Sequence, residues 1–228
     1  MRNLGRILWF VAQRVPFTLI MVMALLWVAY YTNSMYGRLP HLWLHRLGYS
    51  PRDLVFVRWD RLFTSAFVTD GGHILRQAIC MILLGVGLAE YLGGTRWAFA
   101  IFWSVHIMVL MGDPMLITYP LHWDHFTSST ILRVARDVGP SVGYYACMGL
   151  ATVWFPKYWR WIAGGGLLLG LIIFFWWQMV MQHVAVTKSS SNLAHILAVA
   201  LAWLIYYTGR GLRRNLDRRR MQVHEASA

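Results

Sequence analysis

The chain contains apolar stretches that are nearly long enough to cross a bilayer and that carry almost no charge inside them. A membrane-spanning helix needs about 20 predominantly apolar residues, because the hydrocarbon core is roughly 30 Å thick. Hydrophobic residues make up 58% of the sequence and charged residues 13%, and most charged residues lie between the apolar stretches. A soluble helix instead alternates an apolar face with a charged one. The pattern therefore predicts an all-α integral membrane protein that crosses the membrane several times.

Proline, glycine and basic residues bound the apolar stretches and mark the expected helix ends. Two connections are long, at about 33–72 and 113–138, and the first is amphipathic and aromatic-rich, as an interfacial segment would be. A signal peptide is the weaker interpretation of the first stretch, because no small-residue cleavage motif follows it. We expect one domain over 1–228 with six membrane helices, at about 16–31, 73–92, 97–111, 141–155, 161–181 and 192–207, and a basic tail at 208–228.

The formal net charge of +12 comes mainly from arginines. In a soluble protein, such a charge would suggest a nucleic-acid partner. Here the basic residues of the termini and the short loops gather on one side of the expected bundle, which is typical of the cytoplasmic side of a membrane protein. We therefore expect the bundle to lie in a lipid bilayer with both termini in the cytoplasm, and we expect no nucleic-acid partner.

Polar residues lie near the outer ends of the three helices that would run from the outside inward. They are His73 and Gln77 on the second helix, Ser141 at the start of the fourth, and Asn192 and His195 on the sixth. Polar groups at membrane depth are costly, so each is a functional candidate. At ~1.5 Å per residue, Ser141 and His195 each lie about 22–24 Å from the inner boundary, and His73 lies at about the same level. One layer of the bundle is therefore expected to hold a serine and two histidines.

These side chains match the needs of acyl transfer. A serine hydroxyl becomes nucleophilic when a nearby base takes its proton, and histidine is the usual base. The positive partial charge of a helix N-terminus favours an oxyanion and keeps a histidine neutral. His73 and Gln77 stand one turn apart on one face, from which both could donate to the oxyanion. We therefore expect Ser141 to be the nucleophile and His195 the base of a hydrolase that needs no metal and no cofactor.

Other interpretations of the polar residues are weaker. The stretch GPSVG at 139–143 matches G-x-S-x-G, but the α/β-hydrolase elbow requires a preceding strand, and the sequence RVARD does not predict one. His122 and His125, with Asp124, form an H-x-x-H pair that could begin a metal site, but they lack a clear third ligand. Asp137 could orient the histidine as a third triad member, or it could be a favourable charge at a helix N-terminus.

Over about 59–202, the chain resembles the rhomboid family of bacterial intramembrane serine proteases. The stretch RLFTSAF at 61–67 is similar to the family's R-x-F-T-x-A-F. His73 and Gln77 resemble its H-x-x-x-N oxyanion motif, and Glu90 with the following Leu-Gly pair resembles the end of the same helix. This part of the chain therefore looks like the second membrane helix of that family.

Two further motifs carry the resemblance. Gly139-x-Ser141, followed by Tyr145 one turn later, is similar to the family's nucleophile helix, in which the tyrosine stacks on the catalytic histidine. The sequence NLAHI, which contains Asn192 and His195, is similar to the start of its last core helix. The resemblance implies a six-helix rhomboid-like bundle in the bacterial inner membrane. It further implies a Ser141–His195 dyad, oxyanion donors His73 and Gln77, supporting residues Gly139, Tyr145 and Asn192, and transmembrane segments of other proteins as substrates.

The chain also departs from the family pattern. Gln77 replaces the oxyanion asparagine, Val142 replaces the glycine that usually follows the serine, and Pro140 has no N–H to contribute to an oxyanion hole. These changes favour an alternative, a weak or inactive rhomboid-like protein that binds transmembrane helices. The presence of both Ser141 and His195 favours the enzyme.

Overall fold

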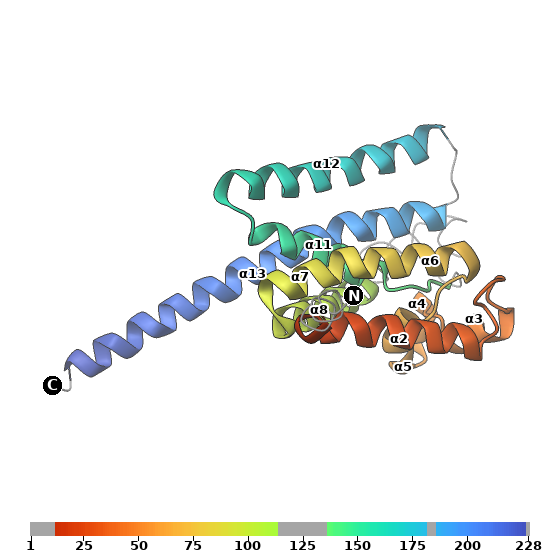
Figure 1. Cartoon of the computed structure of the whole chain (residues 1–228), viewed down its shortest axis with the longest axis horizontal. Helices are drawn as coiled ribbons and strands as arrows, with labels where there is room; N and C mark the ends of the chain where they lie inside the picture. The colour runs from red at the N-terminus through yellow and green to blue at the C-terminus, as the bar shows by residue number, and fades with distance from the viewer. Residues whose placement is uncertain (1–11, 114–135, 182–185, 227–228) are drawn as a thin grey trace, which may run out of the picture.

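The computed structural model describes residues 12–113, 136–181 and 186–226, and Figure 1 shows a bundle of helices with one long helix that extends beyond it. These described residues form helices and no strand, apart from two isolated β-bridges. Four segments are long and apolar enough to cross a membrane: Gly72–Gly93, Thr95–Gly112, Lys157–Gln178 and Ser191–Arg213. The fold is therefore all-α, and these segments mark the chain as a membrane protein.

The first apolar helix, α2 (Pro16–Tyr31), is capped by a side chain from a distant part of the chain. Proline suits the first helical position because its nitrogen needs no partner there, and Val15 provides no side-chain cap. The buried carboxylate of Glu90 accepts hydrogen bonds from the backbone N–H groups of Phe17 at 2.9 Å and Thr18 at 2.8 Å. Glu90 thus satisfies N–H groups that a helix start leaves without partners.

The first long connection folds into short helices. In Figure 1 they lie beside the C-terminal end of α2. Short helices of this kind suit a membrane boundary, where water and lipid headgroups can bond the backbone groups that helix ends leave unpaired. They are α3 (His41–Leu47), α4 (Pro51–Val55), α5 (Asp60–Thr64) and the 3-10 turn η1 (Ser65–Phe67).

The second membrane helix contains a π-helical turn that the sequence analysis did not predict. It consists of α6 (Gly72–Met81), the π-helical η2 (Ile82–Val86) and α7 (Gly87–Gly93). Gly85 lies in this turn, where a Cβ atom would come within 2.8 Å of the Tyr144 carbonyl oxygen. The absence of a side chain at Gly85 therefore lets the widened turn lie directly against the helix that carries Tyr144.

The remaining helices are α8 (Thr95–Asp113), α11 (Ser141–Val153), α12 (Lys157–Met181) and α13 (Val186–Ala226). Helix α11 is the buried centre of the bundle, although its 13 residues give it a length of only about 20 Å. It packs against α8, the π-helical turn, α7 and α13. Both α11 and the 16-residue α2 are shorter than the roughly 20 residues of an unaided membrane span.

The basic tail expected after residue 207 is helical where the structure describes it. It is helical through Ala226, as a continuation of α13, and Figure 1 shows this dark blue segment standing clear of the bundle. Arginine has a high helix propensity, and a helix that is already nucleated inside the bundle adds residues at little cost. The basic end of the chain is therefore an extension of the last membrane helix.

Candidate functional site

Ser141 is the first residue of α11, and the chain enters it through a turn that requires glycine. Gly139 has a φ of 129°, which residues with a side chain rarely adopt, and its N–H donates to the Ser65 carbonyl at 2.9 Å. Pro140 is the N-cap residue, and its carbonyl accepts from the Tyr144 N–H at 3.0 Å. The serine hydroxyl therefore lies at a helix N-terminus, where N–H groups favour negative charge.

His195 lies on α13 against the ring of Tyr145. The two ring centroids are 4.5 Å apart, and the ring planes are tilted by 36°. Tyr145 follows Ser141 by one helical turn, a rise of about 6 Å, on the same side of α11. No hydrogen bond joins the Ser141 hydroxyl to the His195 ring among the contacts of these two described residues. The serine–histidine contact itself therefore stays a prediction.

Small residues let α11 and α13 approach closely just beyond this ring pair. A Cβ atom on Gly149 would lie 3.1 Å from Cγ1 and 3.2 Å from Cα of Val199. Ala198 and Ala202 are fully buried in the same core. Gly149 and Val199 follow Tyr145 and His195 by one turn each, so the close approach brings these two rings together.

Trp203 of α13 also joins α11 and α13, through hydrogen bonds. Its indole N–H donates to the Gly149 carbonyl at 2.8 Å and contacts the Thr152 hydroxyl at 3.3 Å. Its ring also fills the space that a side chain at Gly164 of α12 would occupy. One aromatic side chain thus joins α11, α12 and α13 inside the bundle.

The expected oxyanion donors form no hydrogen bond with the serine or the histidine. His73 and Gln77 are on α6 with exposed side chains, and neither forms a hydrogen bond with Ser141 or His195. They stand one turn apart on one face of α6, which begins at Gly72. The structure therefore brings together Tyr145 and His195, and it does not join His73 and Gln77 to them.

Asn192 connects the start of the described part of α13 to α12. Its side-chain N–H₂ donates to the side-chain oxygen of Gln178 at 2.9 Å. The sequence analysis did not single out Gln178, although a lone amide among apolar residues is a signal for such a contact. Asn192 thus positions the helix that carries His195 relative to α12.

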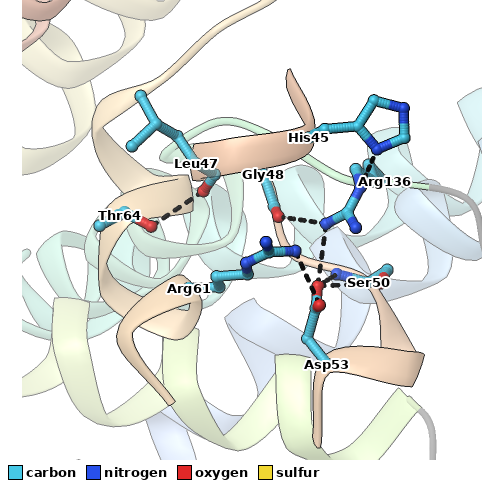
Figure 2. Close-up of polar contacts among 8 residues, drawn as sticks. All are labelled: His45, Leu47, Gly48, Ser50, Asp53, Arg61, Thr64 and Arg136. Carbon is cyan, nitrogen blue, oxygen red and sulfur yellow. Dashed lines mark hydrogen bonds and ion pairs between the residues drawn. The ribbon is translucent and has the colours of Figure 1, made fainter. Parts of the chain in front are cut away.

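A cluster of charged residues, which the sequence analysis missed, holds the segment that leads to Ser141. Figure 2 shows Arg61 and Arg136 pointing toward the Asp53 carboxylate, with N–O distances of 2.7 Å and 3.0 Å. The Ser50 N–H and hydroxyl donate to the same carboxylate, each at 2.9 Å. We call Ser50, Asp53, Arg61 and Arg136 the Asp53 cluster. Burial alone would raise the pKa of Asp53, but the hydrogen bonds from Ser50 and Arg61 and the charge of Arg136 lower it below its usual value.

Arg136 makes the cluster a link between distant parts of the chain. Its guanidinium also donates to the Gly48 carbonyl at 2.8 Å and to the His45 ring at 3.1 Å. The next residue, Asp137, exchanges two backbone hydrogen bonds with Tyr49, at 3.1 Å and 2.8 Å. The first long connection therefore supports the five residues that precede Ser141.

His106 of α8 is buried near Val138 and Gly139, which precede Ser141. One of its ring nitrogens lies 3.1 Å from the Leu62 carbonyl oxygen, so this histidine holds α8 to α5. His106, Ser65 and Asp137 lie with the apolar side chains of Leu110, Val138 and Val142 around one small space beside Gly139. The segment before Ser141 thus packs against a mixture of polar and apolar side chains from α8 and η1.

No candidate metal centre emerges within the described residues. His122, Asp124 and His125 lie outside the described residues. Among the residues that the structure describes, no group of three or more His, Cys, Asp or Glu side chains could hold a metal ion. Both cysteines are free, Cys80 exposed and Cys147 buried.

Comparisons with protein-family models, with curated proteins and with solved structures find no match for this chain. A functional assignment therefore depends on the arrangement of Ser141, Tyr145 and His195 and on the motifs around them.

Proposed function

We propose that this chain is an intramembrane serine protease of the rhomboid type, with six membrane helices and both termini in the cytoplasm of a bacterial cell. Its substrates are transmembrane segments of other membrane proteins. The contact between Tyr145 and His195, one turn from the Ser141 hydroxyl, is the observation that carries the proposal.

In the proposed reaction, the Ser141 oxygen attacks the carbonyl carbon of the scissile peptide bond while a His195 ring nitrogen takes its proton. The oxyanion that forms is stabilised by the N-terminal N–H groups of α11. Pro140 supplies no N–H, so His73 and Gln77 are the proposed side-chain donors to the oxyanion when a substrate binds. His195 then protonates the leaving amine, and water releases the acyl group from Ser141.

The short helix α11 fits this chemistry. With 13 residues it covers only part of the roughly 30 Å hydrocarbon core, so its N-terminus lies below one membrane boundary. Polar chemistry at that depth requires a cavity that water can enter. A substrate helix must also unwind to expose a peptide bond, so segments with glycine or proline are the expected cleavage sites.

A weak or inactive rhomboid-like protein that binds transmembrane helices is the second candidate. The exposed side chains of His73 and Gln77, which lack hydrogen bonds to Ser141 and His195, favour it. In that case the Tyr145–His195 contact would only hold α11 to α13.

Labelling with a fluorophosphonate probe separates the two candidates, because only an activated serine reacts. We expect the purified protein to be labelled, and Ser141→Ala and His195→Ala to abolish labelling. Ser104→Ala, which removes an exposed serine of α8, is the matched control and should label fully. Equal labelling of Ser141→Ala and the parent protein would rule out the proposed nucleophile. A failure of the folded parent protein to label would support the binding protein.

A further inference from the structure

An apolar groove of about 350 Å³ lies between α2, α3 and the segment that follows α5. Its wall includes Trp27, Val28 and Tyr31 from α2, Trp43 and Leu47 from α3, and Phe67 from η1. Its volume lies in the range of sites that bind small molecules, roughly 300–1,000 Å³. The proposed reaction uses none of these residues.

The surface of the groove offers no polar atom to a peptide or to water. The Thr64 hydroxyl already donates to the Leu47 carbonyl at 2.9 Å, and the rings of Tyr31 and the two tryptophans present only carbon atoms to the groove. An unwound peptide would bring backbone N–H and C=O groups that need partners, and water would need two to four polar contacts. A hydrocarbon chain needs neither, so the groove suits an acyl chain.

Aromatic side chains place the groove at the edge of the bilayer. Trp27 and Tyr31 stack with ring centroids 5.7 Å apart, and Tyr31 lies 5.2 Å from the Trp43 ring. Tryptophan and tyrosine collect at membrane–water boundaries, because their rings have an apolar body and a polar edge. The α2 wall runs from Ala24 to Tyr31, about 10 Å along the helix axis. This length corresponds to the upper part of one lipid leaflet.

A positive charge lies over one of the aromatic rings that line the groove. The Arg46 guanidinium lies over the Trp43 ring, 5.6 Å from its centroid, and its side chain is exposed. Helix α3 contains Arg46, two histidines and no acidic residue. A lipid phosphate beside Arg46 would therefore meet a cation and no opposing carboxylate from this helix.

We propose that this groove binds one acyl chain of an anionic phospholipid whose headgroup contacts Arg46. The apolar lining binds the acyl chain, and the aromatic rings fix the depth of the site in the bilayer. Arg46 favours lipids with a negatively charged headgroup. This lipid site is separate from Ser141 and His195, and it does not depend on the proposed protease activity.

Native mass spectrometry of the purified full chain tests the charge selection, with phosphatidylglycerol and phosphatidylcholine as probes. We expect preferential binding of phosphatidylglycerol, and Arg46→Gln should reduce this preference about fivefold, the factor for one cation near an anionic headgroup. Arg52→Gln is the matched control. Arg52 also lies over a ring, 4.9 Å from the Phe56 centroid, but lines no part of the groove. An unchanged preference in Arg46→Gln would overturn the headgroup contact.

A second variant tests the chain site. Ala24→Phe places a ring inside the groove and should displace the tightly held phospholipid, whereas Ala100→Phe on an exposed face of α8 should not. A photoreactive residue at Val28 should crosslink to lipid. Retention of the lipid by Ala24→Phe, or crosslinking to an added transmembrane peptide in place of lipid, would overturn the proposal.

Discussion

Two regions support the segment that carries Ser141, and they do so by different physical means. On one side, α11 meets α13 where Gly149 lies directly against Val199, and this contact is close van der Waals packing without charged groups. On the other side, the first long connection supports the segment through the Asp53 cluster, where two arginines share one buried carboxylate. The α11–α13 contact thus depends on the size of the side chains, and the support from the first long connection depends on ion pairs in the Asp53 cluster.

The difference follows from the surroundings. Inside a bilayer, apolar surface gains little by leaving lipid, so helices associate where small residues allow close contact. A buried carboxylate is stable only when hydrogen bonds and opposite charges replace its water, and Asp53 has both. The two regions should therefore respond differently to a change of volume and to a change of charge.

The largest expected effect is the loss of the shared carboxylate. Asp53→Ala leaves Arg61 and Arg136 without their partner, and removing one member of a buried ion pair typically costs about 3–5 kcal/mol. We expect a lower Tm and faster proteolysis of the first long connection. Asp60→Ala removes an exposed carboxylate nearby and is the control. Equal stability of the two variants would show that the cluster adds no net stability.

A change of volume tests the opposite region. Gly149→Val would bring a branched side chain against Cα of Val199, which a single Cβ would already approach to 3.2 Å. Overpacking of this kind costs about 1–3 kcal/mol. It should also separate Tyr145 from His195 and reduce probe labelling of Ser141. Gly165→Val is the matched control, because a Cβ atom at Gly165 would meet nothing within 4 Å. Full labelling of Gly149→Val would contradict the role of this close approach.

The pH dependence of stability should come from the charged region and not from the packed one. The folded-state pKa of Asp53 is lowered from 3.8, so its stabilising effect is fully present above that value. The effect is lost as the pH falls through the lower folded-state pKa, because the unfolded chain then binds more protons. We expect the Tm of the parent protein to fall more steeply below about pH 4 than that of Asp53→Asn. Parallel Tm profiles would assign the acid sensitivity to other carboxylates.

The smallest expected effect concerns the amide pair between α12 and α13. Asn192→Ala and Gln178→Ala each remove one partner of a 2.9 Å hydrogen bond. Hydrogen bonds between membrane helices contribute about 0.6 kcal/mol on average, so a double-mutant cycle should give a coupling energy of that order. The cycle is measured as unfolding in detergent. A coupling near zero would mean that packing alone positions the start of α13.

The apolar segments were predictable because hydropathy depends on nearby residues alone. The same local patterns placed Ser141 at a helix start, but they did not predict the helical continuation of α13 through Ala226. The Asp53 cluster was not predictable, since Arg136 follows Asp53 by 83 residues and neither has a distinctive neighbour. The π-helical turn at Gly85 was not predictable either, because it lies against Tyr144 of α11, about 60 residues later in the chain.

The carboxylate at the start of α2 has a consequence for synthesis on the ribosome. Glu90 follows Thr18 by 72 residues, so α2 leaves the ribosome long before its cap exists. At roughly 5–20 residues per second, the delay is about 4–14 s. During that time the N–H groups of Phe17 and Thr18 need water, lipid headgroups or an insertion factor as partners. The first helix is therefore completed only after the second has entered the membrane, which couples the order of insertion to the order of folding.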